Sequence, residues 1–317
     1  MNQWYPDLKV IPILADAKPA ESHGSRGTGS FFSCGVDACY TFLKHYEEIT
    51  TGILIHGFDY QEKHVLIRNT VSSLANKAAS KLNRPLIEVN TNIRTLGDLY
   101  ANWGKQYHGS VLASVALLLS PQLGKVYIPS SYHRNDLFPW GSHPELDSLL
   151  SSDSIQVVHD SCDVTRSQKV SLVAQNDAAL SVLRVCWSDY TKKGLAMNCG
   201  KCEKCIRTMV DLRIAGALDR CHTFRHPLRL KKVARVDMRH GSHRSFYQAS
   251  LRNLKETGAD PALEKALNDC LNGQYYQGIK GKYRDMRKKA YREVLRPMLR
   301  PIERSVRKLA RKILPQD

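Results

Sequence analysis

The chain has 317 residues, with 47 Lys and Arg against 30 Asp and Glu and a formal net charge of +17. This length suffices for one large α/β domain with a smaller appendage, or for two modest domains. Its longest apolar stretch, Val111–Leu119, is far too short to cross a bilayer, and Met1–Pro6 lacks the features of a secretory signal. We therefore expect a cytoplasmic protein whose thiols stay reduced.

Short apolar runs alternate with amphipathic stretches from residue 27 to about residue 215. This alternation is typical of repeated strand–helix units that build a parallel sheet. The predicted strands are Gly29–Ser33, Thr51–Phe58, Pro85–Val89, Lys125–Ile128, Ile155–His159 and Ala179–Val185. The predicted helices are Ala38–His45, His64–Leu82, Ser110–Leu119, Arg166–Asn176 and Ile206–Ala217.

A turn of small residues, Ser33-Cys34-Gly35-Val36-Asp37-Ala38, joins the first strand to the first helix. The free N–H groups and the positive dipole end of a helix favour an anion at such a position. Small residues let backbone amides close around a pyrophosphate, and Asp37 is suited to hold Mg²⁺ or to accept a hydrogen bond from the turn. A tight strand–helix connection without a ligand is the alternative interpretation.

Residues 133–150 break the strand–helix pattern with turn-forming and aromatic residues. We expect a loop after the carboxyl end of a strand, where open α/β sheets bind ligands. Five histidines fall at predicted strand ends or loops: His56, His64, His108, His143 and His159. His143 is the preferred catalytic candidate because Pro144 would fix its loop, although each histidine is also compatible with a purely structural role.

Four cysteines, Cys186, Cys199, Cys202 and Cys205, form two Cys-x-x-Cys steps preceded by a cysteine from the predicted strand before them. This spacing predicts a zinc knuckle over residues 186–205, with four thiolates at the corners of a structural Zn²⁺ site. Ordinary buried thiols are the alternative. Cys34 and Cys39 lie near a predicted helix N-terminus, a setting that lowers the pKa of a thiol.

The chain also carries a series of motifs in a fixed order. They are Ser33, Gly35 and Asp37 of the first turn, then Phe58-Asp59-Tyr60 with His64, then Val164-Thr165-Arg166, and last Val185-Cys186-Trp187 with Cys199-Gly200-Lys201-Cys202 and Cys205. This order resembles the PP-loop ATP pyrophosphatases, and among them the 7-cyano-7-deazaguanine synthases of queuosine biosynthesis. The resemblance covers roughly residues 27–210. Cys34 and Ala38 depart from the family's Ser-Gly-Gly-x-Asp-Ser motif, and Tyr107–Ser110 replaces its Pro-Gly-Arg-Asn segment.

The resemblance implies a Rossmann-like sheet, of the type found in adenine nucleotide alpha hydrolases, with helices on both faces. It further implies ATP, Mg²⁺ and Zn²⁺ as cofactors. ATP would adenylate a carboxylate of a small molecule or deazapurine base and release pyrophosphate, after which ammonia or an amine displaces AMP. The implied nucleotide-binding residues are Ser33, Cys34, Gly35, Val36, Asp37, Ala38 and Asp59. Asp37 would hold Mg²⁺ and Arg166 would neutralise developing phosphate charge.

Two other functions stay open at this point. One is a tRNA-modifying enzyme that transfers sulfur through Cys34 or Cys39, as in other PP-loop members. The other is a nucleotide-binding protein that kept the fold and the metal but lost catalysis. Cys34 and Ala38, which depart from the motif, favour this interpretation.

The C-terminal third differs in charge from the rest of the chain. Residues 206–317 hold 27 Lys and Arg but 11 Asp and Glu, so nearly all of the net charge lies there. We predict a nucleotide-binding domain over residues 1–215 and a basic, mainly helical extension over residues 216–317. RNA and an anionic membrane surface are candidate partners of the basic segment Lys280–Lys312, and solubility alone is the alternative. Self-association into a homo-oligomer is left open.

Overall fold

The computed structural model describes residues 1–12, 14, 26–60, 64–186, 198–238, 241–258 and 260–278, together with individual residues between 282 and 297. The chain divides into two compact units. The first comprises Met1–Leu228 and Ser242–Ala259, and the second comprises Arg229–Gly241 and Asp260–Asp317. The predicted boundary after residue 215 therefore differs from the observed division. Helix α10 (Gly241–Thr257) belongs largely to the first unit, where Ser250 donates a hydrogen bond of 2.6 Å to Asp211.

Five strands of the described chain form one parallel sheet in the order β3-β2-β1-β4-β5. Their bounds are β1 Gly27–Phe31, β2 Thr51–His56, β3 Leu86–Asn90, β4 Leu123–Pro129 and β5 Gln156–Asp160. Each overlaps one of the first five predicted strands. The central strand β1 is hydrogen-bonded along both edges, since Gly29 pairs with Thr51 on one side and with Val126 on the other.

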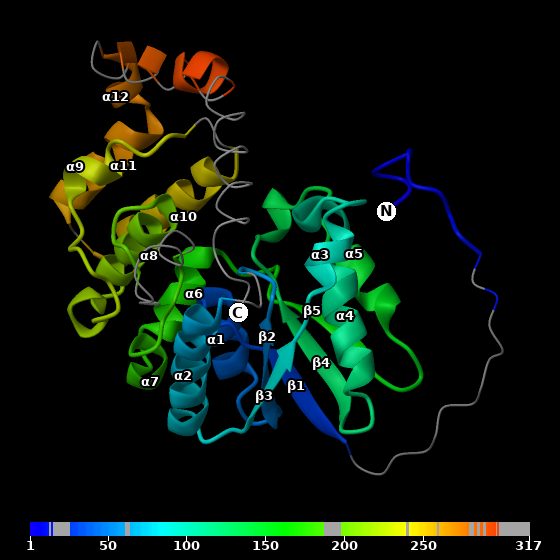
Figure 1. Ribbon diagram of the computed structural model, residues 1–317. Helices are drawn as coiled ribbons and strands as arrows, with labels where there is room; N and C mark the ends of the chain where they lie inside the picture. The colour runs from blue at the N-terminus through cyan, green and yellow to red at the C-terminus, as the bar shows by residue number, and fades with distance from the viewer. Residues whose placement is uncertain are drawn as a thin grey trace, which may run out of the picture. The chain divides into compact units, whose positions relative to one another are not determined.

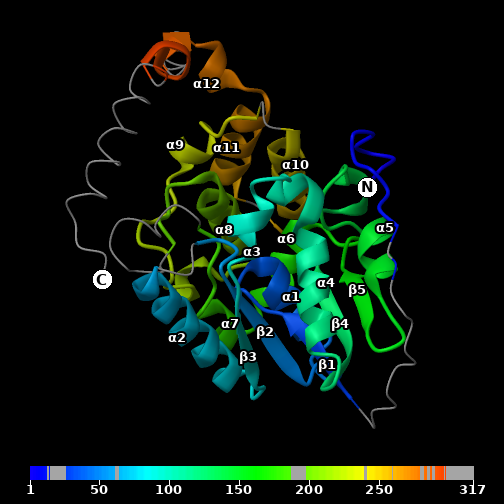
Figure 2. The same cartoon turned by 45° about the vertical axis from the view of Figure 1, so that its right-hand side comes forward.

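Helices cover both faces of the sheet, as predicted for a Rossmann-like α/β fold (Figures 1 and 2). Helices α1 (Val36–Lys44), α2 (Val65–Lys81) and α6 (Arg166–Val173) lie on one face. Their buried residues, among them Phe42, Val71 and Val170, belong to one core cluster. Helices α4 (His108–Leu118) and α5 (Pro144–Asp147) lie on the other face. There Ala113 and Ala116 pack with Val126 in a second cluster.

Shorter elements connect these layers. They are α3 (Ile93–Gly97), a π-helical turn at Trp103–Tyr107, 3₁₀ turns at Arg134–Asp136, Ser148–Leu150 and Leu218–Arg220, and α7 (Asp177–Leu180). The longer helix α8 (Glu203–Ile214) packs against α6. No helix of the described residues is both long enough and apolar enough to cross a membrane.

The predicted strand Ala179–Val185 is wrong. Asn176 caps the short helix α7 by accepting a hydrogen bond from the Ala179 amide, so this stretch begins as a helix and continues as an irregular segment. Val182 and Leu183 are fully buried in the core, which explains the apolar run. The Arg184 amide bonds to the Cys34 carbonyl, and the Val185 amide bonds to the Asn198 side chain. Because those partners satisfy the backbone, the segment is buried without joining the sheet.

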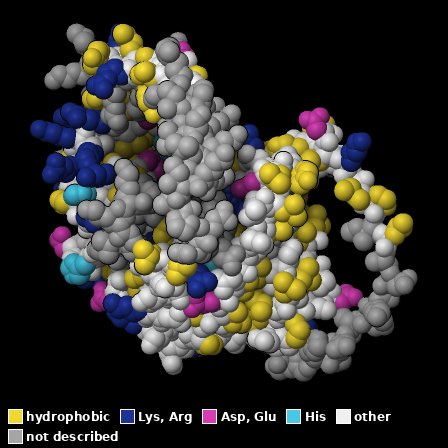
Figure 3. Space-filling model, in the orientation of Figure 1, with side chains coloured by type: hydrophobic (Ala, Val, Ile, Leu, Met, Phe, Trp, Pro, Cys, Tyr) yellow, Lys and Arg dark blue, Asp and Glu magenta, His cyan; other side chains and the backbone are white. Residues whose placement is uncertain are grey.

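The second unit contains α9 (Leu230–Val233), α11 (Pro261–Leu271) and α12 (Gln274–Gln277), with a π-helical turn at Tyr291–Leu295. Leu263 and Leu267 of α11 are buried together with Val233. Arg229, Lys231 and Arg235 are exposed, and Lys and Arg side chains gather over α9 in Figure 3. The expected helical character is thus present in this unit. Most of the basic segment Lys280–Lys312 lies outside the described residues, so its predicted partners stay predictions.

Gly57 follows β2 at a position where only glycine fits. Its φ is +101°, and a Cβ added there would lie 1.8 Å from the Thr91 carbonyl oxygen. Gly216 also has a positive φ, of +64°, but a Cβ there would meet no atom within 4 Å. We expect Gly57→Ala to lower the free energy of unfolding by about 3 kcal/mol or more, and the control Gly216→Ala by about 1–2 kcal/mol. Urea denaturation measures both, and equal losses would contradict the steric explanation.

Candidate functional site

A cavity of about 320 Å³ opens at the carboxyl ends of the strands in the first unit. Strand β1 lies between β2 and β4, so the strand order changes direction beside it. Open α/β sheets bind ligands at such a switch point. The cavity is lined from the predicted loop 133–150 by Leu137, Phe138, Trp140, Ser142 and His143. This loop therefore lines the cavity at the carboxyl ends of the strands, and a ligand there stays a prediction.

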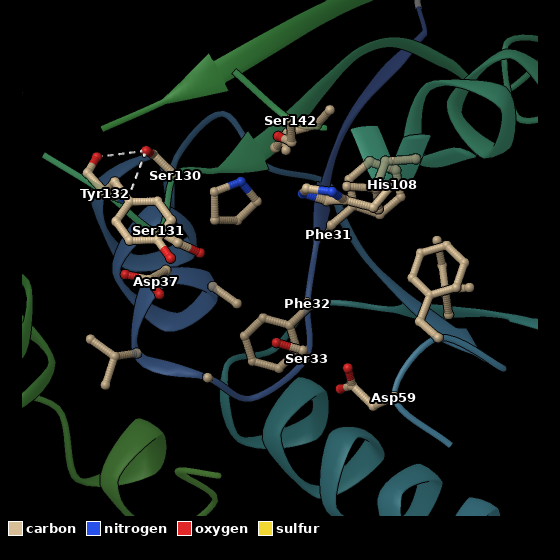
Figure 4. A pocket seen from close by; sticks show the side chains of 18 of the residues that line it. Phe31, Phe32, Ser33, Asp37, Asp59, His108, Ser130, Ser131, Tyr132 and Ser142 are labelled. Carbon is tan, nitrogen blue, oxygen red and sulfur yellow. Dashed lines mark hydrogen bonds between the residues drawn. The ribbon is translucent and has the colours of Figure 1, made fainter. Parts of the chain in front are cut away.

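The turn between β1 and α1 forms one wall of the cavity. Ser33, Gly35, Val36, Asp37 and Ala38 all line it, and Figure 4 shows Ser33, Asp37 and Asp59 along one side with His108 and Ser142 along the other. The Cys39 amide makes the first i→i−4 bond of α1, to Gly35. The three N–H groups before it therefore lack an intrahelical acceptor, as at every helix N-terminus. These N–H groups point toward the start of α1, where the sequence predicts an anion.

Cys34 stands within this turn in the left-handed conformation, with φ of 60°. Its side chain is buried, and burial raises the pKa of its thiol to about 12 even though Arg184 opposes the shift. Burial likewise raises the pKa of Cys39 well above its usual range. Both shifts are opposite to the sequence-based expectation. Both thiols lie in the apolar core. The lowered thiol pKa that would have favoured a sulfur-transfer enzyme is therefore not found.

Asp37 is held by cations from α6. The Arg166 Nη1 lies 3.1 Å from one carboxylate oxygen and the Lys169 Nζ lies 3.6 Å from the other. Burial alone would raise the pKa of Asp37, but these charges outweigh it and hold the pKa below its ordinary value. Lys169 is itself almost completely buried and donates to the Ser130 carbonyl at the end of β4. The ion pairs therefore join α1, α6 and β4 behind the cavity wall.

Further cations surround this group. Arg184 lines the cavity and lies 3.8 Å from Asp59. Lys204 of α8 also lines it, and burial together with Arg166 and Arg207 lowers the pKa of Lys204 to about 7. The Arg207 guanidinium lies over the Phe246 ring, 3.8 Å from its centroid. Burial raises the pKa of the nearby Asp211, which weakens its role as a counter-charge.

Basic side chains gather around the cavity. Arg166, Arg184 and Lys204 line it together with Asp37 and Asp59, and Lys169 and Arg207 lie behind them. The structure thus brings together Ser33, Asp37, Asp59 and Arg166, as the sequence predicted. It adds Lys169 and Lys204, which the sequence analysis missed although Lys169 lies one helical turn after Arg166.

The expected Mg²⁺ role of Asp37 has a limited basis here. Mg²⁺ prefers six oxygen ligands, and Asp37 offers one carboxylate that already contacts two cations. The fit improves only if phosphate oxygens supply most of the remaining ligands, which is how Mg²⁺ commonly binds nucleotides.

His143, the preferred catalytic candidate, has a structural contact instead. Its Nδ1 accepts a hydrogen bond from the Glu145 amide and thereby caps α5, while its ring meets Trp4 edge to face at 4.7 Å. His159 differs, because its Nδ1 lies 2.7 Å from an oxygen of the buried Asp147. Its Nε2 is buried and has no hydrogen-bond partner among the described residues. The sequence showed both histidines, but not which of them had a carboxylate beside it.

The four predicted metal ligands do come together. Their Sγ atoms lie within 4.8 Å of one another, with 3.7 Å between Cys186 and Cys202 and 3.8 Å between Cys199 and Cys205. A tetrahedral Zn²⁺ with Zn–S bonds of about 2.3 Å separates its sulfurs by about 3.8 Å. All four are free thiols at these separations. The donor set and the spacing fit a Zn²⁺ ion.

Asn198 fixes the geometry of this cysteine cluster. Its side-chain oxygen accepts from the amides of Val185 and Cys186, and its Nδ2 donates to the Leu183 carbonyl and to Thr223. Cys202 is the N-cap residue of α8 and Cys205 lies in its first turn. Because Lys204 lies between these two cysteines, the cluster also positions a cation of the cavity. Trp187 lies outside the described residues.

Comparisons with known protein families, with curated proteins and with solved structures find no match. The resemblance to PP-loop enzymes therefore stays a prediction from the motifs.

The thiol environments predict an order of alkylation. At pH 8 iodoacetamide should modify the partly exposed Cys162 well before the buried Cys34 and Cys39, because the thiolate is the reactive form and burial suppresses it. Peptide mass spectrometry over a time course measures this, and urea-unfolded protein, in which the three thiols should react alike, is the control. Labelling of native Cys34 as fast as Cys162 would restore the case for a reactive thiol.

Proposed function

We propose that the cavity binds the phosphates of ATP and that the protein adenylates a carboxylate of a small molecule, with release of pyrophosphate. Ammonia or an amine then displaces AMP. One observation carries this proposal, namely the cluster of buried basic side chains beside the free N–H groups of the α1 N-terminus. Arg166, Arg184 and Lys204 reach the cavity from three different segments.

The physical reason is the cost of burying charge. A cation removed from water is unfavourable unless an anion or dipoles replace its hydration. A polyphosphate carries several negative charges and many acceptor oxygens, so it matches this site better than a single carboxylate does. In the transition state, charge grows on the departing pyrophosphate, and Arg166 and Lys204 would stabilise it there.

The other parts of the cavity suit the rest of the ligands. Trp103, Phe138 and Trp140 supply apolar and aromatic surface that fits the planar ring of a base or of the acid substrate. Asp59 lies on the same side as Ser33 and could accept from nucleoside hydroxyl groups. Mg²⁺, if bound, would take Asp37 as a ligand together with phosphate oxygens and would neutralise part of the phosphate charge.

A second candidate is nucleotide binding without catalysis. It is favoured by the contacts of Asp37, whose two oxygens both face cations, and by Ala38, which offers no hydroxyl to a phosphate. Pyrophosphate release separates the two candidates, because a protein that only binds would release none.

We also propose that the cysteine cluster holds one structural Zn²⁺ ion. The four thiolates leave no open coordination position, so the metal would fix the start of α8 rather than act on a substrate.

The phosphate site can be tested with one pair of variants. Arg166→Ala should weaken the binding of pyrophosphate and of a non-hydrolysable ATP analogue roughly 10- to 100-fold, because a charge-assisted contact is removed. Arg220→Ala is the matched control, since Arg220 pairs with the exposed Asp177 and does not line the cavity. Isothermal titration calorimetry measures both. A parent protein that binds neither ligand would overturn the proposed function.

The metal site has its own test. Cys202→Ser should remove about one zinc per chain and lower the thermal midpoint markedly, because binding free energy at such a site is folding free energy. Cys162→Ser, outside the cluster, is expected to change neither. Elemental analysis and a thermal melt decide this. Full-length parent protein that contains no metal after expression in zinc-supplemented medium, and gains none on titration, would contradict the prediction.

A further inference from the structure

His159 lies at the carboxyl end of β5, in register with Ile128 of β4. Alternation along a strand sends neighbouring side chains to opposite faces. Asp160 accordingly contacts α1, where Thr41 donates to it at 2.7 Å and Lys44 at 3.0 Å. His159 faces the other layer and contacts Asp147 of α5. The strand end therefore places an imidazole on the α4–α5 side of the cavity.

Asp147 is fixed before any ligand arrives. It is completely buried, and its Oδ2 accepts from the Ser142 hydroxyl at 2.6 Å as well as facing the His159 Nδ1 at 2.7 Å. The His143 amide approaches its Oδ1 at 3.3 Å. Because these contacts use the Asp147 oxygens as acceptors, they favour the His159 tautomer with the proton on Nδ1. That tautomer leaves a lone pair on Nε2.

The Nε2 atom of His159 is the imidazole nitrogen among the buried side-chain atoms of the described residues for which no hydrogen-bond partner is found. The His159 side chain is 6% exposed and lines the cavity, yet Nε2 has no hydrogen-bond partner within the described part of the chain. Leaving a buried polar atom unpaired is unfavourable, and a catalytic or ligand-binding role is one explanation for such an atom in a native structure. We infer that Nε2 of His159 is the proton acceptor for the nucleophile that attacks the activated carboxylate, with Asp147 as its positioning residue.

This inference rests on the proposed adenylation. In the second step an amine nitrogen forms a bond to the acyl carbon, and the bond from that carbon to the AMP oxygen breaks. AMP leaves with the bonding electron pair. The proton of the amine passes to Nε2, and the resulting imidazolium is stabilised by the Asp147 carboxylate until it returns the proton to water.

Two other histidines lie near His159 and must be weighed against it. His143 uses its Nδ1 as the cap of α5, as described above. His108 lies at the start of α4, and its Nδ1 lies 3.2 Å from the Trp103 carbonyl, a neutral acceptor. A carboxylate stabilises an imidazolium far more than a carbonyl does, and burial lowers the pKa of His108. His159 is thus the histidine of this group that is best placed to take up a proton.

The kinetic test separates the two half-reactions in the full-length protein. The probes are ATP, Mg²⁺, a panel of aromatic and aliphatic carboxylic acids, and ammonium chloride as the nucleophile. His159→Asn keeps an amide N–H for Asp147 but replaces the basic Nε2 by an amide oxygen, which does not take up a proton near neutral pH. It should leave pyrophosphate–ATP exchange within about threefold of the parent and reduce AMP and amide formation about 10²- to 10⁴-fold. His64→Asn, an exposed histidine outside the cavity, is the matched control.

A second measurement does not depend on substrate. Long-range ¹H–¹⁵N spectra of the histidines should show His159 with a protonated Nδ1 and a bare Nε2. In Asp147→Asn the amide can donate to Nδ1, and the proton should then move to Nε2, a change that a purely structural role for Asp147 would not require.

Either of two results would overturn the inference: full AMP and amide formation in His159→Asn, or a parent tautomer with the proton on Nε2. If no acid supports exchange, the proposed adenylation fails. The spectra still decide in that case whether His159 presents an acceptor to the cavity.

Discussion

The ion pair between Asp37 and Arg166 is the contact on which the arrangement of the cavity depends. It joins the first turn of α1 to the first turn of α6, and Lys169 extends it to the end of β4. Removing one partner of a buried pair costs several kcal/mol, because the remaining charge stays buried without compensation. Asp37 therefore keeps mutually repelling cations close together. The contacts of Asp37 with Arg166 and Lys169 thus hold these basic side chains at the wall of the cavity.

This balance explains why stability and function meet at the same residues. A protein selected for stability alone would replace such cations by apolar side chains of similar volume, often without loss. Here cations lie on α6, on α8 and on the segment that contains Arg184. Local choices that lower stability without an evident gain tend to mark functional sites. The cysteine cluster lies at the start of α8, the helix that carries Lys204 and Arg207.

Much of the fold could be predicted because the strands are apolar and short and the turns between them contain small or polar residues. Ala179–Val185 was wrongly predicted as a strand for the same physical reason, since burial makes a segment apolar whether or not it joins a sheet. Asp37, Asp59 and Arg166 were found from motif order. Lys204 was not, because it lies on a helix with several buried faces, and a single sequence does not show that those faces are covered. The contact of His159 with Asp147 depends on the path of the loop 133–150, which no periodicity encodes.

The two sides of the cavity differ in what they can do chemically. Ser33 and Asp37 lie on one side, together with the free amides of α1, whereas Ser142 and His108 lie on the other, where His159 contacts Asp147 (Figure 4). Transfer to an activated carboxylate needs both properties at once: positive charge where the phosphate leaves, and a proton acceptor where the nucleophile enters. A base beside the cations would be disfavoured, because their field would oppose its protonation. The separation across the sheet, with cations toward α1 and α6 and the imidazole toward α5, removes that conflict. It follows from the alternation of side chains along β5, which sends Asp160 to the first layer and His159 to the second.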